Sequence, residues 1–509
     1  LWFQPRFVAN SGQIVQGQGS LTPPPAVPEL AARGIIQQVF PVHEQRILNR
    51  LMKSWVQAVC ENQPLDDICD YFGVKIAMYF AWLGFYTSAM VYPAVFGSVL
   101  YTFTEADQTS RDVSCVVFAL FNVIWSTLFL EEWKRRGAEL AYKWGTLDSP
   151  GEAVEEPRPQ FRGIRRISPI TRAEEFYYPP WKRLLFQLLV SLPLCLACLI
   201  CVFILMLGCF QLQELVLSVK GLPRLVRFLP KVMLALLVSV SAEGYKKLAV
   251  WLNDMENYRL ESTYERHLII KVVLFQFVNS YLSLFYIGFY LKDMDRLKEL
   301  LLLLSLTQSL ERQLQAVLVP LAALRFRLLL LSLRGLLLVA RAKVRAGEGQ
   351  CQPGLMGPPV CPQDTFQDYQ EMFVQFGYVV LFSSAFPLAA LCALVNNLIE
   401  IRSDAFKLCT GLQRPFGRRV ESIGQWQKVM EAMGVLAIVV NCYLIGQCGQ
   451  LQRLFPWLSP EAAIVSVVVL EHLALLVKYL IHVAIPDIPG WVAEEMAKLE
   501  YQRREAFKV

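Results

Sequence analysis

Apolar runs long enough to cross a lipid bilayer recur along this chain. Hydrophobic residues make up 55% of its 509 positions and charged residues only 18%. Because a membrane-spanning helix needs about 20 mostly apolar residues, this pattern is typical of a polytopic membrane protein and not of a soluble enzyme. The runs predict an all-α polytopic membrane protein with ten transmembrane helices, at about residues 76–100, 113–131, 184–210, 232–251, 268–291, 297–319, two within 366–408, 429–448 and 462–485.

The chain also divides by composition. Residue 1 is Leu and no signal peptide precedes the first span, so we expect a truncated cytosolic N-terminal portion. The leucine-rich segment 321–340 carries three arginines and is expected to lie at the membrane interface. The predicted domains are a remnant of the N-terminal domain with its linker (1–75), helices 1–6 plus the interfacial leucine-rich helix (76–340), a cytosolic loop (341–365), helices 7–10 (366–485) and a cytosolic C-terminal tail (486–509).

Basic residues gather in particular loops. The net charge of +6 is modest, so the clustering suits membrane orientation better than nucleic-acid binding. Loops 134–183 and 405–428 are basic and are expected in the cytosol, together with both termini. Basic residues between spans three and four and between spans five and six fit this topology less well.

The stretch 366–408 is expected to form a helical hairpin. Phe386-Pro387 lies at its centre, and proline breaks a helix because it lacks the amide N–H. A single span over 373–398 would instead place the basic loop 405–428 outside the cytosol. The topology therefore favours two spans here.

Two acidic pairs bracket the apolar part of this hairpin. Asp368 and Glu371 precede it, and Glu400 and Asp404 follow it, at spacings that place each pair on one helix face. On adjacent helices these acids would lie at similar depth and repel one another. The sequence therefore predicts that they need a cation, a basic side chain or protons.

Polar residues inside two other spans are candidates for a transport path. Glu243, Lys246 and Lys247 lie near the inner end of the fourth span, where the alternative is that the lysines extend to the headgroups. Gln276 and Asn279 lie within the fifth span, where they serve helix association equally well.

No catalytic motif is evident. His43, His267, His472 and His482 are the only histidines, and the sequence contains no nucleophile elbow, phosphate loop or zinc-ligand spacing. We expect neither an enzyme nor a nucleic-acid partner.

Several strings together resemble the anoctamin family. They cover about residues 65–300 and 366–509, and the narrower resemblance, carried by the segment from Glu261 onward and by 286–293, is to the branch of anoctamin-8 and anoctamin-10. The strings are YFGVKIAMYFAWLGFY (71–86), WKRRGAELAYKWG (133–145), FYYPPWK (176–182), LFQFVN (274–279), the acidic segment 396–404 and IPDIP (485–489).

The resemblance implies a ten-helix homodimer in which each protomer has a lipid-facing groove flanked by spans three to seven. Members of the family are calcium-activated chloride channels, calcium-activated phospholipid scramblases, or tethers between endoplasmic reticulum and plasma membrane. It further implies a calcium site at Asp368, Glu371, Glu400 and Asp404. On span six, however, the family asparagine and glutamate fall on Arg312 and Ala316.

This departure predicts weakened calcium regulation. Calcium prefers six to eight oxygen ligands, and an Arg312 guanidinium pointing inward would act as an internal counter-ion for the carboxylates. The alternative is that Arg312 faces lipid headgroups or the groove and that the acids bind calcium regardless.

Three functions remain open at this point. Phospholipid scrambling would use the polar groups of spans four and five, and a chloride channel would use lysines such as Lys246, Lys247 and Lys271. A non-transporting tether would use the basic loops to bind a second membrane. The resident membrane is expected to be the endoplasmic reticulum or the plasma membrane.

Overall fold

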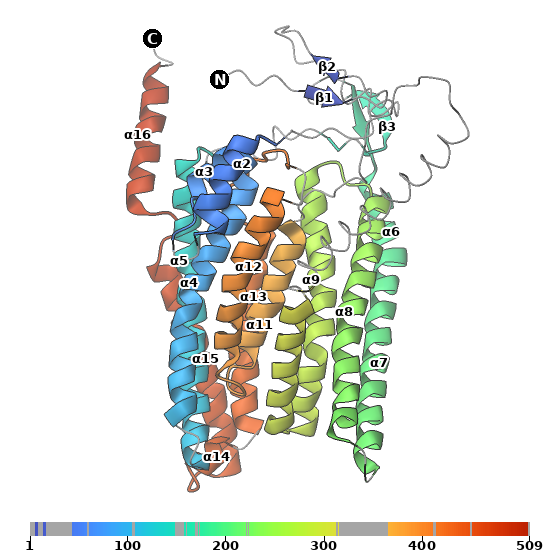
Figure 1. Cartoon of the computed structure of the whole chain (residues 1–509), viewed down its shortest axis with the longest axis vertical. Coiled ribbons are helices and arrows are strands. Elements are labelled where there is room, and N and C mark those ends of the chain that lie inside the picture. Colours follow the sequence, from blue (N-terminus) through green and yellow to red (C-terminus); the bar gives the residue numbers. More distant parts are fainter. Residues whose placement is uncertain are drawn as a thin grey trace, which may run out of the picture. The chain divides into compact units, whose positions relative to one another are not determined.

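The computed structural model consists mostly of long helices (Figure 1). Two units are distinguished by their internal packing, one made of Leu1–Ala81, Ser309–Thr365 and Asn397–Arg419, and the other of Trp82–Gln308, Phe366–Asn396 and Val420–Val509. Each is described by itself. The structure describes residues 6–8, 14–16, 43–58, 61–103, 107–147, 157–158, 160–167, 172, 174–219, 221, 223–311, 314, 365–410, 414–447 and 450–506.

The first unit packs around buried aromatic rings. It holds α2 (Gln45–Leu51), η1 (Met52–Val56), α3 (Leu65–Phe72), the start of α4 (Val74–Phe103) and the end of α12 (Ala389–Thr410). Trp55 on η1 is fully buried, with its ring 4.5 Å from that of Phe80. Gly73 has φ +93°, and a Cβ on it would lie 2.4 Å from the Cα of Gly417. Glycine is therefore required where α3 turns into α4 against the segment that follows α12.

The second unit contains the remaining long helices. Those before the hairpin are α5 (Gln108–Lys143), α6 (Pro180–Phe186), η2 (Gln187–Ser191), α7 (Leu192–Ser218), α8 (Arg224–Met255), α9 (Glu261–Phe285), η3 (Tyr286–Leu291) and, up to Gln308, a helix over 294–311. Those that follow are α11 (Thr365–Leu381), α13 (Gln425–Gln447), α14 (Gln450–Leu454), α15 (Pro460–Ala484) and α16 (Gly490–Ala506).

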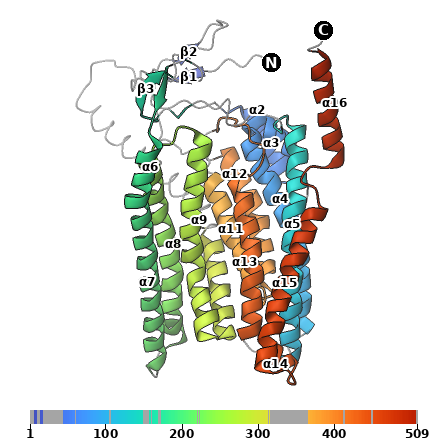
Figure 2. The ribbon, with the colours of Figure 1, turned by 180° about the vertical axis from the view of Figure 1, so that it is seen from behind.

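Two groups of helices form within this unit. Helices α7, α8 and α9 pack side by side, and α5, α13 and α15 pack together (Figure 2). Helices α9 and α11 approach closely at Gly377, where an added Cβ would lie 1.9 Å from the hydroxyl oxygen of Tyr281. That hydroxyl donates to the carbonyl of Val374 at 2.9 Å, so this contact fixes α9 against α11.

The expected break in the hairpin is present. Helix α11 ends at Leu381 and α12 begins at Ala389, so the chain turns around Phe386 and Pro387. The turn packs against α4, because a Cβ on Gly97 would lie 2.4 Å from the carbonyl oxygen of Pro387.

The all-α expectation is incomplete. The described part of the chain contains two antiparallel two-stranded sheets, β1 (Arg6–Val8) with β2 (Ile14–Gln16) and β3 (Ile164–Ile167) with β4 (Glu174–Tyr177). The second sheet lies in a stretch expected to be a loop, where exposed residues gave no core-facing alternation to predict a strand. The polar tail likewise contains a helix, α16.

Among the residues that the structure describes, six helices are long and apolar enough to cross a membrane, which supports a multi-pass membrane protein. They are Val74–Thr102, Gln108–Lys143, Pro180–Ser218, Glu261–Leu291, Gln425–Gln447 and Pro460–Ala484. Helices α8, α11, α12 and 294–311 are not among the six, since α8 carries many charges and α11 has 17 residues. Ten spans therefore stay a prediction. The leucine-rich segment 321–340 and Arg312 lie outside the described residues.

Candidate functional site

Helix α12 carries a buried row of oxygen-bearing side chains. Asn397, Glu400 and Asp404 follow one another at helical spacing, and their exposed fractions are 0%, 3% and 0%. Asp404 accepts hydrogen bonds from the Tyr79 hydroxyl and from Lys407 Nζ, both at 2.9 Å. The side-chain oxygen and nitrogen of Asn397 have no hydrogen-bond partner. Two buried carboxylates beside an unpaired amide oxygen match the hard oxygen ligands that calcium prefers.

Helix α11 connects its acid to α8 through a glutamine. Gln367 donates to Glu371 Oε1 at 3.2 Å, and its own Oε1 accepts from Lys246 Nζ at 3.2 Å. The ammonium group of Lys246 also lies 5.8 Å from the centre of the Phe366 ring. Lys246 therefore reaches a neighbouring helix through a residue that sequence reasoning did not single out.

The two acidic pairs fall in different units, and the structure describes each within its own. Asp368 and Glu371 are half-buried on α11, whereas Glu400 and Asp404 are buried on α12. In the part of the chain that the structure describes, no three His, Cys, Asp or Glu side chains are grouped so as to hold a metal ion. The four-acid calcium site stays a prediction.

Helix α9 has a buried polar face on which three side-chain oxygen atoms lack hydrogen-bond partners. Gln276, Asn279 and Ser283 are 7%, 3% and 2% exposed. The amide nitrogens of Gln276 and Asn279 donate to Ser280 Oγ at 2.9 Å and to the carbonyl of Val238 at 2.8 Å. Gln276 Oε1, Asn279 Oδ1 and Ser283 Oγ have no partner. Both residues predicted from sequence thus lie on one face, which Ser283 extends.

The remaining candidates on α8 differ from Lys246. Glu243 and Lys247 are exposed, while Lys246 is half-buried and pairs with Gln367. The structure therefore places only one of these three side chains in a defined polar contact between helices.

A buried ionic network joins α8, α9 and η2, and sequence reasoning missed it. Glu256 is 0% exposed. Its Oε1 accepts from Ser191 Oγ at 2.7 Å, and its Oε2 accepts from Lys271 Nζ at 2.6 Å, from Gln187 Nε2 at 3.2 Å and from the Tyr258 hydroxyl. Both carboxylate oxygens are therefore hydrogen bonded.

Surrounding residues complete the network. Lys271 also donates to Asn253 Oδ1 at 2.9 Å, and Arg183 donates to the backbone carbonyls of Glu256 and Asn257 at 3.0 Å each. Burial raises the pKa of Glu256, but the hydrogen bonds from Lys271, Tyr258 and Ser191 outweigh it and hold the pKa below its ordinary value of 4.5. The signal in the sequence was the polar run 253–258 that directly follows the fourth apolar segment.

This architecture, in which long apolar helices carry buried polar and ionic groups, defines a multi-pass helical membrane protein. The family model "Anoctamin: Calcium-activated chloride channel" matches residues 68–499, and the chain belongs to the anoctamin family. That family is one of channels and scramblases, not of enzymes.

Curated relatives agree with this assignment. The chain is 63% identical to anoctamin-8 from Mus musculus and 61% identical to anoctamin-8 from Homo sapiens, in both cases over 100% of this chain. It is 38% identical to anoctamin-10 from Mus musculus over 94% of this chain and 72% of that protein.

The anoctamin-8 relatives are longer than this chain. The chain spans 67% of the mouse protein and 58% of the human protein. The alignment with the mouse protein runs over 712 positions, compared with 509 residues here, so that protein contains sequence without a counterpart in this chain.

Proposed function

We propose that this chain moves phospholipid across a membrane along a groove beside α8 and α9, with chloride as the alternative cargo, and that its calcium regulation is weakened. The observation that supports transport most directly is the polar face of α9. A buried polar atom without a hydrogen bond costs free energy, on the order of 1–3 kcal/mol. Three such atoms on one apolar helix are explained if water or lipid headgroups contact this face during transport.

The surroundings of this face suit a lipid. Helix α7, on the other side of α8, exposes large apolar side chains such as Leu196, Ile200 and Ile204 at 50%, 59% and 60%. Acyl chains would remain on this apolar surface while a headgroup follows the polar residues. Lys246, held near α11, provides a positive charge for a phosphate at one end of the path.

Phospholipid is favoured over chloride by the environment of Lys271. An anion channel needs positive charges available along its pore. The Lys271 ammonium is instead engaged by Glu256 at 2.6 Å and by Asn253 at 2.9 Å. A lysine neutralised in this way offers little attraction to chloride.

Weakened calcium regulation is supported by the contacts of Asp404. Asp368, Glu371, Glu400 and Asp404 would hold the ion, and bound calcium would supply the positive charge that offsets their repulsion. Lys407 and Tyr79 already bond the two oxygens of Asp404, so calcium must compete with an internal ammonium group. Arg312 would add a second internal cation.

The test of transport is an assay on the purified full chain in liposomes, with fluorescent phospholipid and chloride flux measured in parallel, each with calcium and with chelator. The double variant Gln276→Leu, Asn279→Leu should lose most lipid transport. Asn122→Leu is the matched control, because Asn122 on α5 is 0% exposed and both of its side-chain polar atoms are unpaired. Equal transport by the double variant and the wild type would refute the α9 path, and chloride flux without lipid transport would assign the channel function.

The test of calcium regulation is direct metal binding. Lys407→Met should tighten calcium binding about tenfold, the effect of removing one competing interaction of about 1.4 kcal/mol, when measured by titration calorimetry. Lys428→Met on α13, an exposed lysine, is the control. Unchanged affinity in Lys407→Met argues against competition at Asp404, and unchanged affinity in Arg312→Glu argues against the arginine counter-ion.

A tether between membranes is the alternative function, supported by the β3–β4 hairpin. Ile164 and Ile167 are 65% and 67% exposed and flank Arg165 and Arg166. A basic surface with exposed apolar side chains suits binding to an anionic membrane. Wild-type proteoliposomes that cluster vesicles containing anionic lipid, with clustering lost in Ile164→Asn, Ile167→Asn and no transport detected, would support the tether over the transporter.

We also propose a homodimer in the endoplasmic reticulum or plasma membrane, with both termini in the cytosol. Helix α15 supports a partner or lipid contact, since Ile464, Val469 and Leu473 on it are 67%, 52% and 53% exposed.

A further inference from the structure

The short segment between α14 and α15 carries the most exposed aromatic side chain in the part of the chain that the structure describes. Trp457 is 79% exposed, and Phe455 is 44% exposed. Their rings meet edge to face with centroids 6.1 Å apart, and together they form an apolar surface that we call the 455–457 tip. Neither residue lies on α8 or α9, so the tip is separate from the proposed transport path.

The backbone on both sides holds this tip in one shape. The amide of Phe455 donates to the carbonyl of Leu451 at 2.9 Å, and the amide of Leu458 donates to the carbonyl of Phe455 at 3.0 Å. Ser459 caps α15, because its hydroxyl oxygen accepts from the amide of Ala462 at 3.3 Å. The exposed rings are therefore already ordered, and little conformational entropy is lost when they bind.

The length of α15 places the tip relative to the bilayer. This helix has 25 residues and is among the described helices that are apolar enough to cross a membrane. At 1.5 Å per residue it is about 37 Å long, which exceeds the hydrocarbon core of about 30 Å but not the whole bilayer of about 40–45 Å. When α15 crosses the membrane, its first residue therefore lies among the lipid headgroups, and the tip directly before it lies there too.

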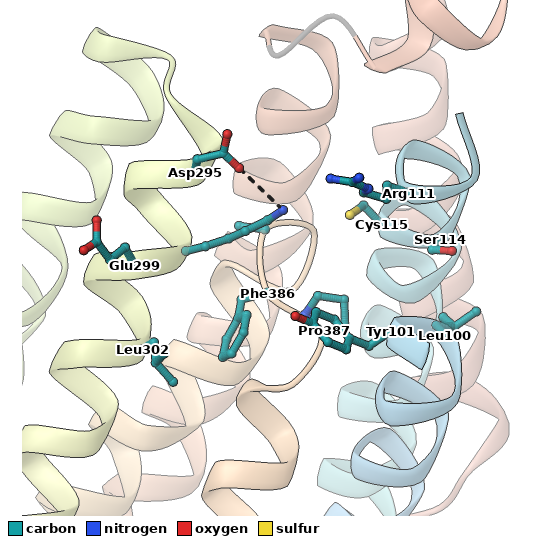
Figure 3. A pocket seen from close by; sticks show the side chains of 12 residues that line it. Leu100, Tyr101, Arg111, Ser114, Cys115, Asp295, Glu299, Leu302, Phe386 and Pro387 are labelled. Atoms are coloured by element: carbon teal, nitrogen blue, oxygen red, sulfur yellow. Dashed lines mark ion pairs between the residues drawn. The ribbon is translucent and has the colours of Figure 1, made fainter. Parts of the chain in front are cut away.

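Charged side chains at the neighbouring helix ends support the same depth. Arg453 of α14 donates two hydrogen bonds to Asp112 near the start of α5, at 2.7 and 3.0 Å. Two basic and two acidic side chains, Arg111 of α5 among them, line a cavity of about 600 Å³ between α5 and the 294–311 helix (Figure 3). Charges are costly in hydrocarbon, so these helix ends lie at the headgroups or in water.

An aromatic side chain is also exposed beyond the other end of α15. Trp491 follows this helix and is 50% exposed, and its ring lies 5.8 Å from that of Tyr142 of α5. Trp and Tyr are enriched at both membrane–water interfaces, because their rings are apolar while the N–H or O–H group bonds to headgroups or water. The surroundings of α15 thus match a span with an aromatic residue at each interface.

We propose that the 455–457 tip is a membrane anchor that inserts Phe455 and Trp457 among the lipid headgroups of the leaflet at the α14 end. The indole N–H of Trp457 bonds to phosphate or ester oxygens, while both rings contact the upper part of the acyl chains. The Arg453–Asp112 pair joins the anchored segment to α5 as well as to α15.

Insertion is tested by photocrosslinking of the purified full chain in phosphatidylcholine liposomes. The photoreactive residue p-benzoylphenylalanine at Trp457 should form an adduct with lipid. The matched control is the same residue at Tyr501, which is 62% exposed but lies on the charged helix α16 and donates to Glu505 at 2.6 Å. This control should give no lipid adduct above the dark background.

Two outcomes of this experiment count against the anchor. Equal lipid adducts at the two positions would show that the labelling reflects exposure alone and would overturn the proposal. An adduct between position 457 and a second protomer, in place of lipid, would show that another copy of the chain covers the tip, and it would overturn the proposal as well.

A second measurement determines the depth of the tip. A fluorescent amino acid at Trp457 should be quenched at least about twofold more by phosphatidylcholine with a nitroxide on its headgroup than by phosphatidylcholine with a nitroxide deep in its acyl chain. The order should be reversed at Ile204, which is 60% exposed at the middle of α7. Quenching at 457 by aqueous iodide but by neither lipid would show that the tip projects into water. Either that result or the order expected at Ile204 would overturn the anchor.

Discussion

Two buried polar regions share helix α9, and they differ in whether their polar atoms are hydrogen bonded. Lys271 joins the Glu256 network, in which both carboxylate oxygens are paired. Gln276, Asn279 and Ser283 follow along the same helix, and each has a polar atom without a partner. Burial of polar groups therefore does not by itself mark a transport path. Whether those groups are hydrogen bonded distinguishes a structural contact from a surface that can bind a ligand.

The paired region connects segments that are distant in sequence. Glu256 lies just after α8, Lys271 belongs to α9, and Ser191 is the last residue of η2. A satisfied buried network specifies one arrangement of these segments, since each alternative leaves a charge unpaired in an apolar environment. We expect α7, α8 and α9 to behave as one body at this end, while the unpaired face leaves α9 free to exchange partners further along.

The largest expected effect comes from breaking the paired region. Glu256→Gln leaves the Lys271 ammonium buried without its counter-charge, and such a loss costs about 3–5 kcal/mol. Thermal unfolding of the purified protein should show a marked fall in Tm. The double variant Glu256→Gln, Lys271→Met should recover part of the loss because the two residues are coupled.

A surface pair provides the control for this prediction. Arg504 and Glu500 form an ion pair on α16 with side chains 73% and 62% exposed, and Arg504→Ala should change stability by less than about 1 kcal/mol. If Glu256→Gln had an equally small effect, the network would not be a stabilising contact.

A smaller effect is expected where α9 meets α11. Gly377→Ala would place a methyl group 1.9 Å from the Tyr281 hydroxyl oxygen, so the tyrosine must move and release the Val374 carbonyl. Overpacking of this kind costs about 1–3 kcal/mol. Gly208→Ala on α7 has no neighbouring atom within 4 Å, and there alanine should be neutral or stabilising. Equal Tm values for the two variants would contradict the close packing.

Acid should weaken the paired region but not the packing of α9 against α11. The pKa of Glu256 is lowered in the folded protein, so its contribution to stability is fully present above its ordinary value of 4.5 and is lost as the pH falls through the folded pKa. The difference in Tm between wild type and Glu256→Gln should therefore be constant near neutral pH and shrink below about pH 4.5. The difference between wild type and Gly377→Ala is the control and should not follow this curve.

The contrast within α9 also explains which features could be predicted from the sequence and which could not. Apolar run length located the long helices, and Phe386-Pro387 located the turn between α11 and α12. Gln276 and Asn279 were identifiable because amides are conspicuous in an apolar run. Their unpaired oxygens, however, depend on which atoms neighbouring helices present, and periodicity carries no such information.

The Glu256 network was missed for the same reason. Its members come from η2, the end of α8 and α9, and their proximity arises only from the packing of three helices. Gln367 was also overlooked, because a glutamine at a helix start is usually solvated, whereas here it lies between Lys246 and Glu371. The sequence thus indicated which residues were chemically unusual, and helix packing determined which of them are paired.

The smallest expected effect on stability concerns the unpaired region, and it separates the two regions most sharply. Asn279→Leu removes the hydrogen bond to Val238 at 2.8 Å, worth about 0.5–1.5 kcal/mol, but it also removes an unpaired buried oxygen that costs a similar amount. The same argument applies to Gln276→Leu, which removes the hydrogen bond from Gln276 to Ser280. Both variants should unfold within about 1 kcal/mol of the wild type, while lipid transport falls.

A loss of stability comparable to that of Glu256→Gln would instead show that these amides hold helices together in the same way as the network does. Unchanged stability together with unchanged transport would leave their unpaired atoms without a function. An unchanged Tm together with a loss of lipid transport would fit a face that contacts lipid headgroups. The loss of a structural contact would instead lower Tm.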